Sequence, residues 1–172
     1  MYLIGVITIS NIEIDEVFNK NTKDVFKQFV DIDLDERVYK ASDIKLYDGV
    51  SIVVSFSGIV SGQIIVNITS ELTKVIYHRY TKGILAVEID KNVKETIFEL
   101  SKLIIGNSCA SFYGNGISME IASYCITEGN DVSFAWIDKE ITIIDYETLL
   151  SELRMMLILD INGKLELSDF NN

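Results

Sequence analysis

The sequence is poor in the side chains that most enzymes use for metal binding or nucleophilic catalysis. Its 172 residues include one histidine, His78, two cysteines and no proline. A single histidine excludes the common sites that need several, and a Ser–His or Cys–His catalytic pair would depend on that one residue. We interpret His78 as a surface or half-buried packing residue. A metal- or nucleophile-based enzyme is therefore the least favoured class of function.

Basic side chains are scarce relative to acidic ones. Fifteen lysines and arginines stand against 26 aspartates and glutamates, which gives a net charge of -11. Sequence-independent binding to nucleic acid requires lysine and arginine to displace the counterions of the phosphates. Docking on anionic lipid requires basic residues as well. The composition therefore predicts neither nucleic acid nor a membrane surface as a partner.

A membrane-spanning run and an export signal are also missing. No apolar run approaches the roughly 20 residues that cross a bilayer. The beginning, MYLIGVITISNIEIDE, has no basic segment and no small-residue cleavage site. We therefore predict a cytoplasmic protein, in which Cys109 and Cys125 are reduced and buried among apolar neighbours.

Apolar residues, in contrast, are abundant. They make up 48% of the chain, and a domain of about this size buries roughly 70% of the surface of its unfolded chain. No repeat, linker or low-complexity segment interrupts the sequence. We therefore predict a single domain over residues 1–172.

Three stretches have the spacing of amphipathic helices. The two longer ones cover about 11–30 and 92–112, and the second is broken by the turn YGNG. A short helix is expected within 69–83, with Thr69 or Ser70 as its cap. On one face of the first segment the spacing places Ile14, Phe18, Val25 and Phe29.

Strand-like runs fill much of the remainder, and Gly58 and Gly62 supply a turn between two of them. After residue 116 the runs follow one another without a helix between them, which favours antiparallel pairing. The predicted fold class is α+β, with two longer helices packed on a largely antiparallel β-sheet. The predicted strands cover residues 2–9, 36–40, 50–57, 61–68, 117–127, 132–137, 140–144 and 153–161.

The longest predicted helix carries a compact charged stripe. Glu95, Glu99 and Lys102 share one side, opposite an apolar face. The simplest interpretation is a solvated helix exterior, with an i,i+3 ion pair from Glu99 to Lys102 worth about 0.2–0.5 kcal/mol. The apolar face consists of Val93, Ile97, Leu100 and Ile104.

Five motifs, taken in order, point beyond this simple interpretation. They are DEVFNKNTKDVFKQF, VSFSGIVSGQIIVNIT, ETIFELSKLIIGN, GISMEIASYCITEGNDV and YETLLSELRMMLIL. None is specific alone, but their order and spacing resemble the CheX branch of the CheC/CheX chemotaxis phosphatases over about residues 14–159. The resemblance implies a CheX-like fold and a function in two-component signalling.

Proteins of this family, as the resemblance implies, remove phosphate from the aspartyl phosphate of CheY-like receiver domains. The receiver carries its own Mg²⁺ and lysine, so no cofactor or metal site of this chain is expected. A glutamate on the phosphatase helix fixes the docked helix through an ion pair, and an asparagine amide orients the attacking water. Positioning of this kind is a large part of catalysis in phosphoryl transfer. The family also implies a homodimer formed through a sheet edge.

The chain departs from the family at the most important position. Glu99 matches the family's acid, but Lys102 stands where the asparagine is expected. An amide offers an acceptor and donors, whereas an ammonium offers donors only and is a poor holder of water. Lys102 can also fold back on Glu99. A lesser departure is Glu95, where the family has Asp or Ser.

We therefore predict that Glu95 and Glu99 contact a receiver, and that the catalytic pair Glu99 and Lys102 has weak or no phosphatase activity. The alternative is a non-catalytic interaction or scaffold module that uses the same fold. Glu16 and Asn19 repeat the Glu-x-x-Asn spacing on the first helix. We interpret that second pair as a coincidence of composition.

Overall fold

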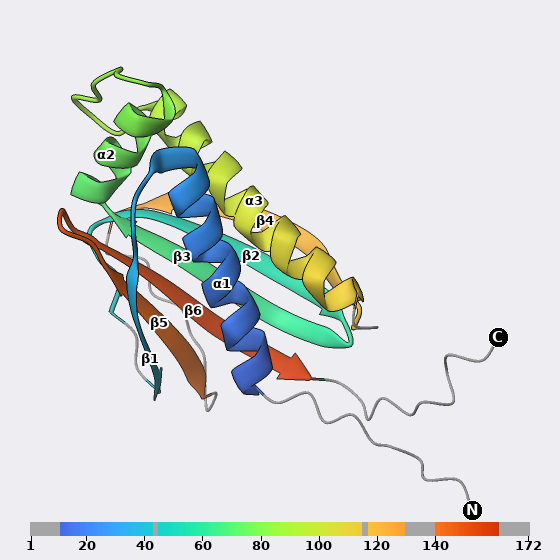
Figure 1. The fold of residues 1–172 in the computed structure, drawn as a ribbon. Helices are drawn as coiled ribbons and strands as arrows, with labels where there is room; N and C mark the ends of the chain where they lie inside the picture. The colour runs from blue at the N-terminus through green and yellow to red at the C-terminus, as the bar shows by residue number, and fades with distance from the viewer. Residues whose placement is uncertain (1–10, 43–44, 115–116, 130–139, 162–172) are drawn as a thin grey trace, which may run out of the picture.

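The computed structural model describes residues 11–42, 45–114, 117–129 and 140–161, in which three helices cover one face of a six-stranded sheet (Figure 1). The two longer helices, α1 and α3, and the antiparallel sheet confirm the predicted α+β class. Predicted strands at 2–9 and 132–137 lie outside the described residues. The elements are α1 (Asn11–Val30), β1 (Asp35–Ala41), β2 (Gly49–Gly58), β3 (Val60–Thr69), α2 (Ser70–Tyr80), α3 (Lys91–Gly114), β4 (Met119–Glu128), β5 (Ile141–Glu147) and β6 (Glu152–Ile161).

The sheet has the strand order β1-β5-β6-β3-β2-β4, and every neighbouring pair is antiparallel. Two hairpins, β2–β3 and β5–β6, supply the central strands. Among the described residues, β1 and β4 each pair with one neighbour only and so form the two edges. The strands of these two hairpins follow each other closely in the sequence, as antiparallel neighbours can, whereas β1–β5, β3–β6 and β2–β4 pair strands that are distant in the sequence.

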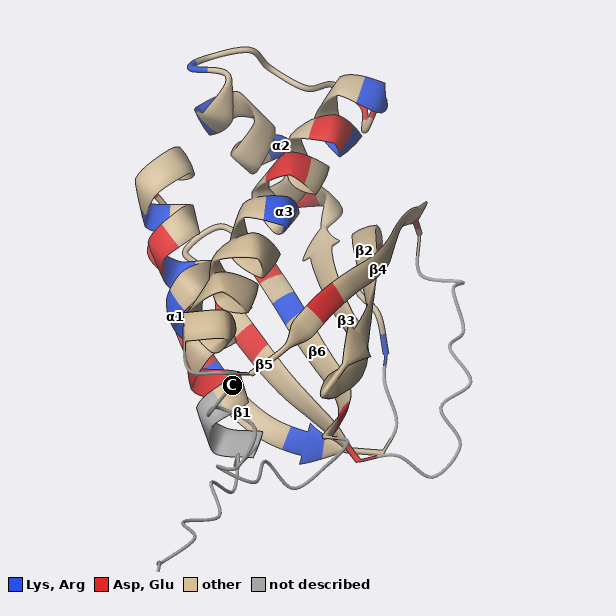
Figure 2. Cartoon of the chain, turned by 90° about the vertical axis from the view of Figure 1, so that its right-hand side faces the viewer, with Lys and Arg blue, Asp and Glu red and all other residues tan. Residues whose placement is uncertain are grey.

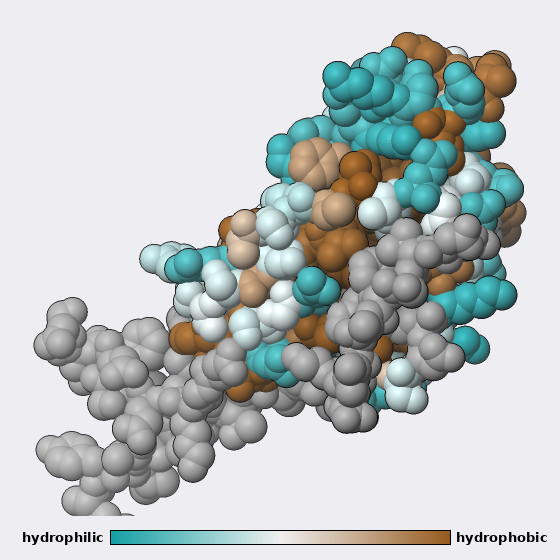
Figure 3. All heavy atoms as spheres, turned by 180° about the vertical axis from the view of Figure 1, so that it is seen from behind, coloured by the Kyte–Doolittle hydropathy of each residue, from teal (hydrophilic) through white to brown (hydrophobic). Residues whose placement is uncertain are grey.

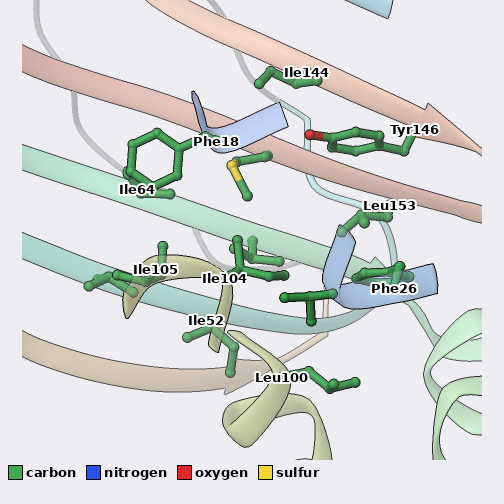
Figure 4. Close-up of a cluster of buried hydrophobic side chains, with 14 of the residues drawn as sticks. Phe18, Phe26, Ile52, Ile64, Leu100, Ile104, Ile105, Ile144, Tyr146 and Leu153 are labelled. Atoms are coloured by element: carbon green, nitrogen blue, oxygen red, sulfur yellow. The ribbon is translucent and has the colours of Figure 1, made fainter. Parts of the chain in front are cut away.

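The main core lies between the sheet and the helices (Figure 4). Phe18 and Phe26 of α1 and Ile104 of α3 point toward the sheet, and all three are buried. The central strands contribute the buried side chains of Ile52, Ile64 and Leu153 to the same core. This packing holds α3 in place along its length, so that its opposite side is presented to solvent.

A second, smaller apolar cluster lies on the other face of the sheet. Side chains alternate between the two faces of a strand, and the central strands are apolar at successive positions, so both faces carry core residues. Figure 3 shows apolar side chains gathered in the middle of the face seen from behind. The cluster consists of Leu46, Val53, Ile65, Ile141, Ile143, Met156 and Ile158.

The two glycines of the β2–β3 hairpin have different roles from those predicted. Gly58 ends β2 at the turn with a φ of 108°, a conformation that favours glycine. Gly62 lies inside β3, outside the turn, with a φ of 128°. A Cβ on Gly62 would lie 2.1 Å from the carbonyl oxygen of Ile158 on β6. The second glycine therefore permits close approach of two strands.

The short helix α2 begins and ends as the sequence indicates. The Thr69 hydroxyl caps its start by accepting a hydrogen bond of 3.4 Å from the amide of Leu72. After its end, Gly83 has a φ of 123° and donates its N–H to the carbonyl of His78 at 2.9 Å. His78 is half-buried, as predicted. In the part of the chain described here, no helix has the length and apolarity needed to cross a membrane.

Two expectations about burial are wrong. Phe29 was expected on the buried face of α1, but its side chain is exposed because the packed face passes through Phe26 and Val30. Cys125 was expected to be buried, but it lies exposed on the edge strand β4. Cys109 on α3 is half-buried, and burial raises the pKa of its thiol to about 11.

Candidate functional site

The predicted charged stripe lies on the solvent side of α3. This helix packs against α1, α2, β2 and β4, and it buries its four predicted apolar positions, Val93, Ile97, Leu100 and Ile104. The stripe faces the other way, with side-chain exposures of 60% for Glu95, 54% for Glu99 and 43% for Lys102. Figure 2 shows charged residues along this helix.

Lys102 folds back on Glu99. Its Nζ lies 3.1 Å from Oε1 and 3.3 Å from Oε2 of that carboxylate, so the ammonium spans both oxygens. The same nitrogen lies 5.4 Å from the centre of the Phe98 ring, within the range of a cation–π contact. Both acceptor atoms of Glu99 are therefore engaged inside the chain. An exposed pair of this kind contributes about 0–1 kcal/mol, so a competing cation can displace it.

Glu95 belongs to a different pair. Its Oε1 lies 3.5 Å from Nζ of Lys91, one turn toward the start of the helix. The three predicted residues therefore share one face of α3 but form two separate ion pairs, Lys91–Glu95 and Glu99–Lys102. Both pairs are exposed and both can be exchanged for contacts with a partner.

Beside this face lies an apolar groove between α3 and the edge strand β4, which run side by side (Figure 2). Its volume is about 490 Å³. The Phe98 ring packs edge-on against Tyr124 with 5.3 Å between ring centres, and burial raises the pKa of the Tyr124 hydroxyl. The lining residues are Lys91, Lys94, Glu95, Phe98, Tyr124 and Ile126.

Sequence reasoning did not find this groove. Its walls come from α3 and from β4, two elements whose contact is set by tertiary packing. Lys94, which lines the groove, joins α3 to β4 through an ion pair of 2.5 Å with Glu128. One local feature of the sequence could have indicated it: the aromatic residue Phe98 lies between the charged positions Glu95 and Glu99, away from the predicted apolar face.

The second Glu-x-x-Asn spacing on α1 has a structural use. Nδ2 of Asn19 donates a hydrogen bond of 3.2 Å to Oε1 of Glu36 on β1. Lys23 binds the other oxygen of the same carboxylate. The amide of Asn19 therefore helps to join α1 to the edge strand β1. Within the described ranges, no group of three or more His, Cys, Asp or Glu side chains is arranged to hold a metal ion.

The fold is that of the CheC/CheX-like chemotaxis proteins. A CheC-like superfamily protein from Shewanella sp. PV-4 matches with a TM-score of 0.80 at 16% identity, over 88% of this chain and 99% of that chain. The chemotaxis protein CheX from Desulfovibrio desulfuricans matches with a TM-score of 0.76 at 19% identity, over 86% and 99%.

A third similar chain comes from the CheX–CheY–BeF3–Mg2+ complex of Borrelia burgdorferi, with a TM-score of 0.72 at 17% identity. The match covers 87% of this chain and 99% of that chain. No protein-family model and no curated protein matches the sequence. At these identities the likeness establishes the fold, and it confirms the predicted CheC/CheX resemblance at that level. The roles of Glu95, Glu99 and Lys102 stay predictions.

Proposed function

We propose that this protein is a cytoplasmic two-component signalling protein that binds a phosphorylated CheY-like receiver domain through α3, with weak or no phosphatase activity. One observation carries the proposal: on a CheX-like fold, the exposed face of α3 presents Glu99 with Lys102 folded onto it. A chain of similar fold occurs in a CheX–CheY–BeF3–Mg2+ complex, which supports a receiver as the partner.

Binding requires Glu99 to exchange Lys102 for a cation of the receiver. The internal pair is exposed and contributes about 0–1 kcal/mol, so this exchange costs little. Glu95 lies one turn away and is also exposed, with Lys91 as its neighbour. The two glutamates then form a row of carboxylates along α3 that faces the receiver's conserved lysine.

Catalysis is the step that Lys102 impairs. A water molecule that attacks the aspartyl phosphate must be held in line with the bond that breaks, and an amide oxygen accepts a hydrogen bond from it. The ammonium of Lys102 has no acceptor for this purpose. It also adds positive charge next to the receiver's own lysine and Mg²⁺. The docked helix therefore lies beside the phosphoryl group but cannot orient the attacking water.

The test replaces Lys102 by the family's residue. The decay of a phosphorylated receiver is followed alone, with wild-type protein, and with the Lys102→Asn variant. We expect the wild-type protein to accelerate the decay little, and Lys102→Asn to accelerate it about tenfold or more, equivalent to roughly 1.4 kcal/mol of barrier. Removing Mg²⁺ with EDTA should abolish the effect, because the receiver supplies the metal.

Lys74→Asn on α2 is the matched control, since it makes the same substitution on another helix. It should leave the decay rate at the wild-type value. Equal decay rates with wild-type protein and Lys102→Asn would show that the amide argument is wrong. A binding measurement with and without BeF3 distinguishes the scaffold alternative. A scaffold module would retain a receiver equally well in both states. The proposed function requires a preference for the BeF3-loaded state.

We also propose that the protein forms a homodimer through a sheet edge. Two edges are available among the described strands, β1 and β4. β1 carries charged residues along its length, which discourages strand pairing, whereas the charges of β4 lie near its two ends. The favoured edge is therefore β4.

A further inference from the structure

The groove between α3 and β4 offers an apolar contact surface, which the charged residues Glu99 and Lys102 do not. We infer that it receives an apolar side chain of the receiver domain, next to the receiver's acidic phosphorylation site. This inference rests on the proposed function, since it assumes that a receiver docks on α3. It adds a second contact to the same interface and names the chemistry of that contact.

The lining of the groove suits an apolar side chain. Phe98 and Tyr124 line it as an edge-on aromatic pair, and Ile126 on β4, which also lines it, exposes 39% of its surface. Covering exposed apolar surface of this kind with a partner removes it from water, which favours binding. A volume of about 490 Å³ is ample for one large side chain.

The groove is continuous with the charged face of α3. Glu95 belongs to both, because it lines the groove and lies one turn from Glu99. Phe98 belongs to both as well: its ring packs against Tyr124 in the groove, and Nζ of Lys102 lies 5.4 Å from its centre. A partner that engages Glu99 therefore lies directly beside the groove, and a side chain that enters it also touches the ring over which Lys102 rests.

One lysine at the rim of the groove is exposed enough to contact an acidic neighbour of that side chain. Lys91, Lys94 and Lys102 follow one another along the first half of α3, and each is paired with a glutamate, namely Glu95, Glu128 and Glu99. Lys91 is the most exposed of the three, at 86%, and its contact with Glu95 is 3.5 Å long. A site that binds Mg²⁺ and a phosphoryl group is rich in carboxylates. Lys91 thus complements the receiver surface next to its phosphorylation site.

The chain offers a matched pair of residues for the test. Ile121 and Ile126 both lie on β4, each with 39% of its surface exposed, and they pair with Phe56 and Ile52 of the same neighbouring strand. Only Ile126 lines the groove. The affinity of a BeF3-loaded receiver is measured by isothermal titration calorimetry for the wild-type protein, Ile126→Gln and Ile121→Gln.

We expect Ile126→Gln to weaken binding about fivefold to tenfold, the usual effect of losing one well-packed apolar contact in an interface. Ile121→Gln should change the affinity less than about twofold. If both variants bind like wild type, or both weaken equally, the groove is not part of the interface, while the proposed function stands. If the wild-type protein binds no receiver, the proposed function fails and the groove inference fails with it.

A second measurement needs no variant. In methyl NMR spectra of the wild-type protein, addition of the BeF3-loaded receiver should shift the δ1-methyl signal of Ile126 and leave that of Ile121 in place. If resonances of α3 around Glu99 shift but the methyl signal of Ile126 does not, the receiver docks on α3 without entering the groove. That result would overturn the inference and leave docking on α3 intact.

Discussion

Two glycines with nearly the same φ angle have very different surroundings. Gly62 in β3 has a φ of 128° and Gly83 after α2 has a φ of 123°. A Cβ added to Gly62 would lie 2.1 Å from the carbonyl oxygen of Ile158, whereas a Cβ on Gly83 would meet nothing within 4 Å. The pair separates the cost of a strained backbone from the cost of a steric clash.

We predict that Gly62→Ala destabilises the protein by about 3–5 kcal/mol, because it combines backbone strain with a clash against β6. Gly83→Ala should cost only about 1–2 kcal/mol, since strain alone remains. Urea unfolding monitored by circular dichroism measures both. Equal losses for the two variants would show that β3 and β6 separate at no cost and that the close approach is unimportant.

At the scale of elements, one polar network holds four parts of the chain together on the second face of the sheet. Arg154 of β6 donates to both carboxylate oxygens of Asp145 on β5, at 2.5 and 2.9 Å. Tyr39 of β1 donates to the same carboxylate at 2.8 Å. Nη1 of Arg154 donates to the carbonyl of Lys45 at 2.6 Å, which fixes the segment before β2.

This network makes stability depend on pH. Burial alone would raise the pKa of Asp145, but the hydrogen bonds from Arg154 and Tyr39 outweigh it, and the pKa lies below its usual value of 3.8. A carboxyl whose pKa is lower in the folded state stabilises the protein fully above its unfolded pKa. That contribution is lost as the pH falls below about 4 and passes through the folded pKa.

We predict that Asp145→Asn lowers the free energy of unfolding at pH 7 by about 2–3 kcal/mol, since it leaves the half-buried guanidinium of Arg154 without its counter-charge. The difference from wild type should shrink as the pH falls below about 4, because the carboxyl is protonated first in the unfolded state and at a still lower pH in the folded state. Urea unfolding at pH 7 and at pH 3 checks this. Asp33→Asn, at an exposed ion pair with Lys27, is the control and should change stability by less than about 0.5 kcal/mol. A difference between Asp145→Asn and wild type that is the same at both pH values would contradict the argument.

At the scale of the whole molecule, the two edges of the described sheet differ in charge. The described sheet has a charged edge at β1 and a nearly uncharged central stretch at the β4 edge, where Cys125 is exposed. An unpaired edge without charges is a template for another strand. The proposed homodimer therefore depends on β4, which also forms one wall of the groove.

We predict that Cys125→Lys shifts the protein from dimer to monomer, because a lysine in the middle of an edge strand opposes pairing with a second copy. Analytical ultracentrifugation measures the dissociation constant, which should rise about tenfold or more, or by about 1.4 kcal/mol. Val38→Lys on the β1 edge is the control and should leave the dimer intact. Dissociation by Val38→Lys alone would place the interface at the other edge.

Several elements could be predicted because their signals are local. The helical spacing in 11–30 and 92–112 places apolar side chains on one side of each helix, whichever element packs there. The observed helices α1 and α3 cover nearly the same residues. The hairpin of β2 and β3 was marked by its glycines, although only Gly58 lies at the turn. The exposed face with Glu95, Glu99 and Lys102 was predictable for the same reason, since it is the complement of a buried face.

Apart from Phe29, the sequence by itself determined which faces of the helices are buried, because the spacing of apolar residues along a helix fixes them. Only the tertiary structure decided what meets those faces and edges: the groove of Phe98, Tyr124 and Ile126, the strand contact at Gly62 and the exposure of Cys125. These features join residues from different elements. Their contacts depend on strand order and register, and no local pattern in a single chain encodes the order in which strands pair.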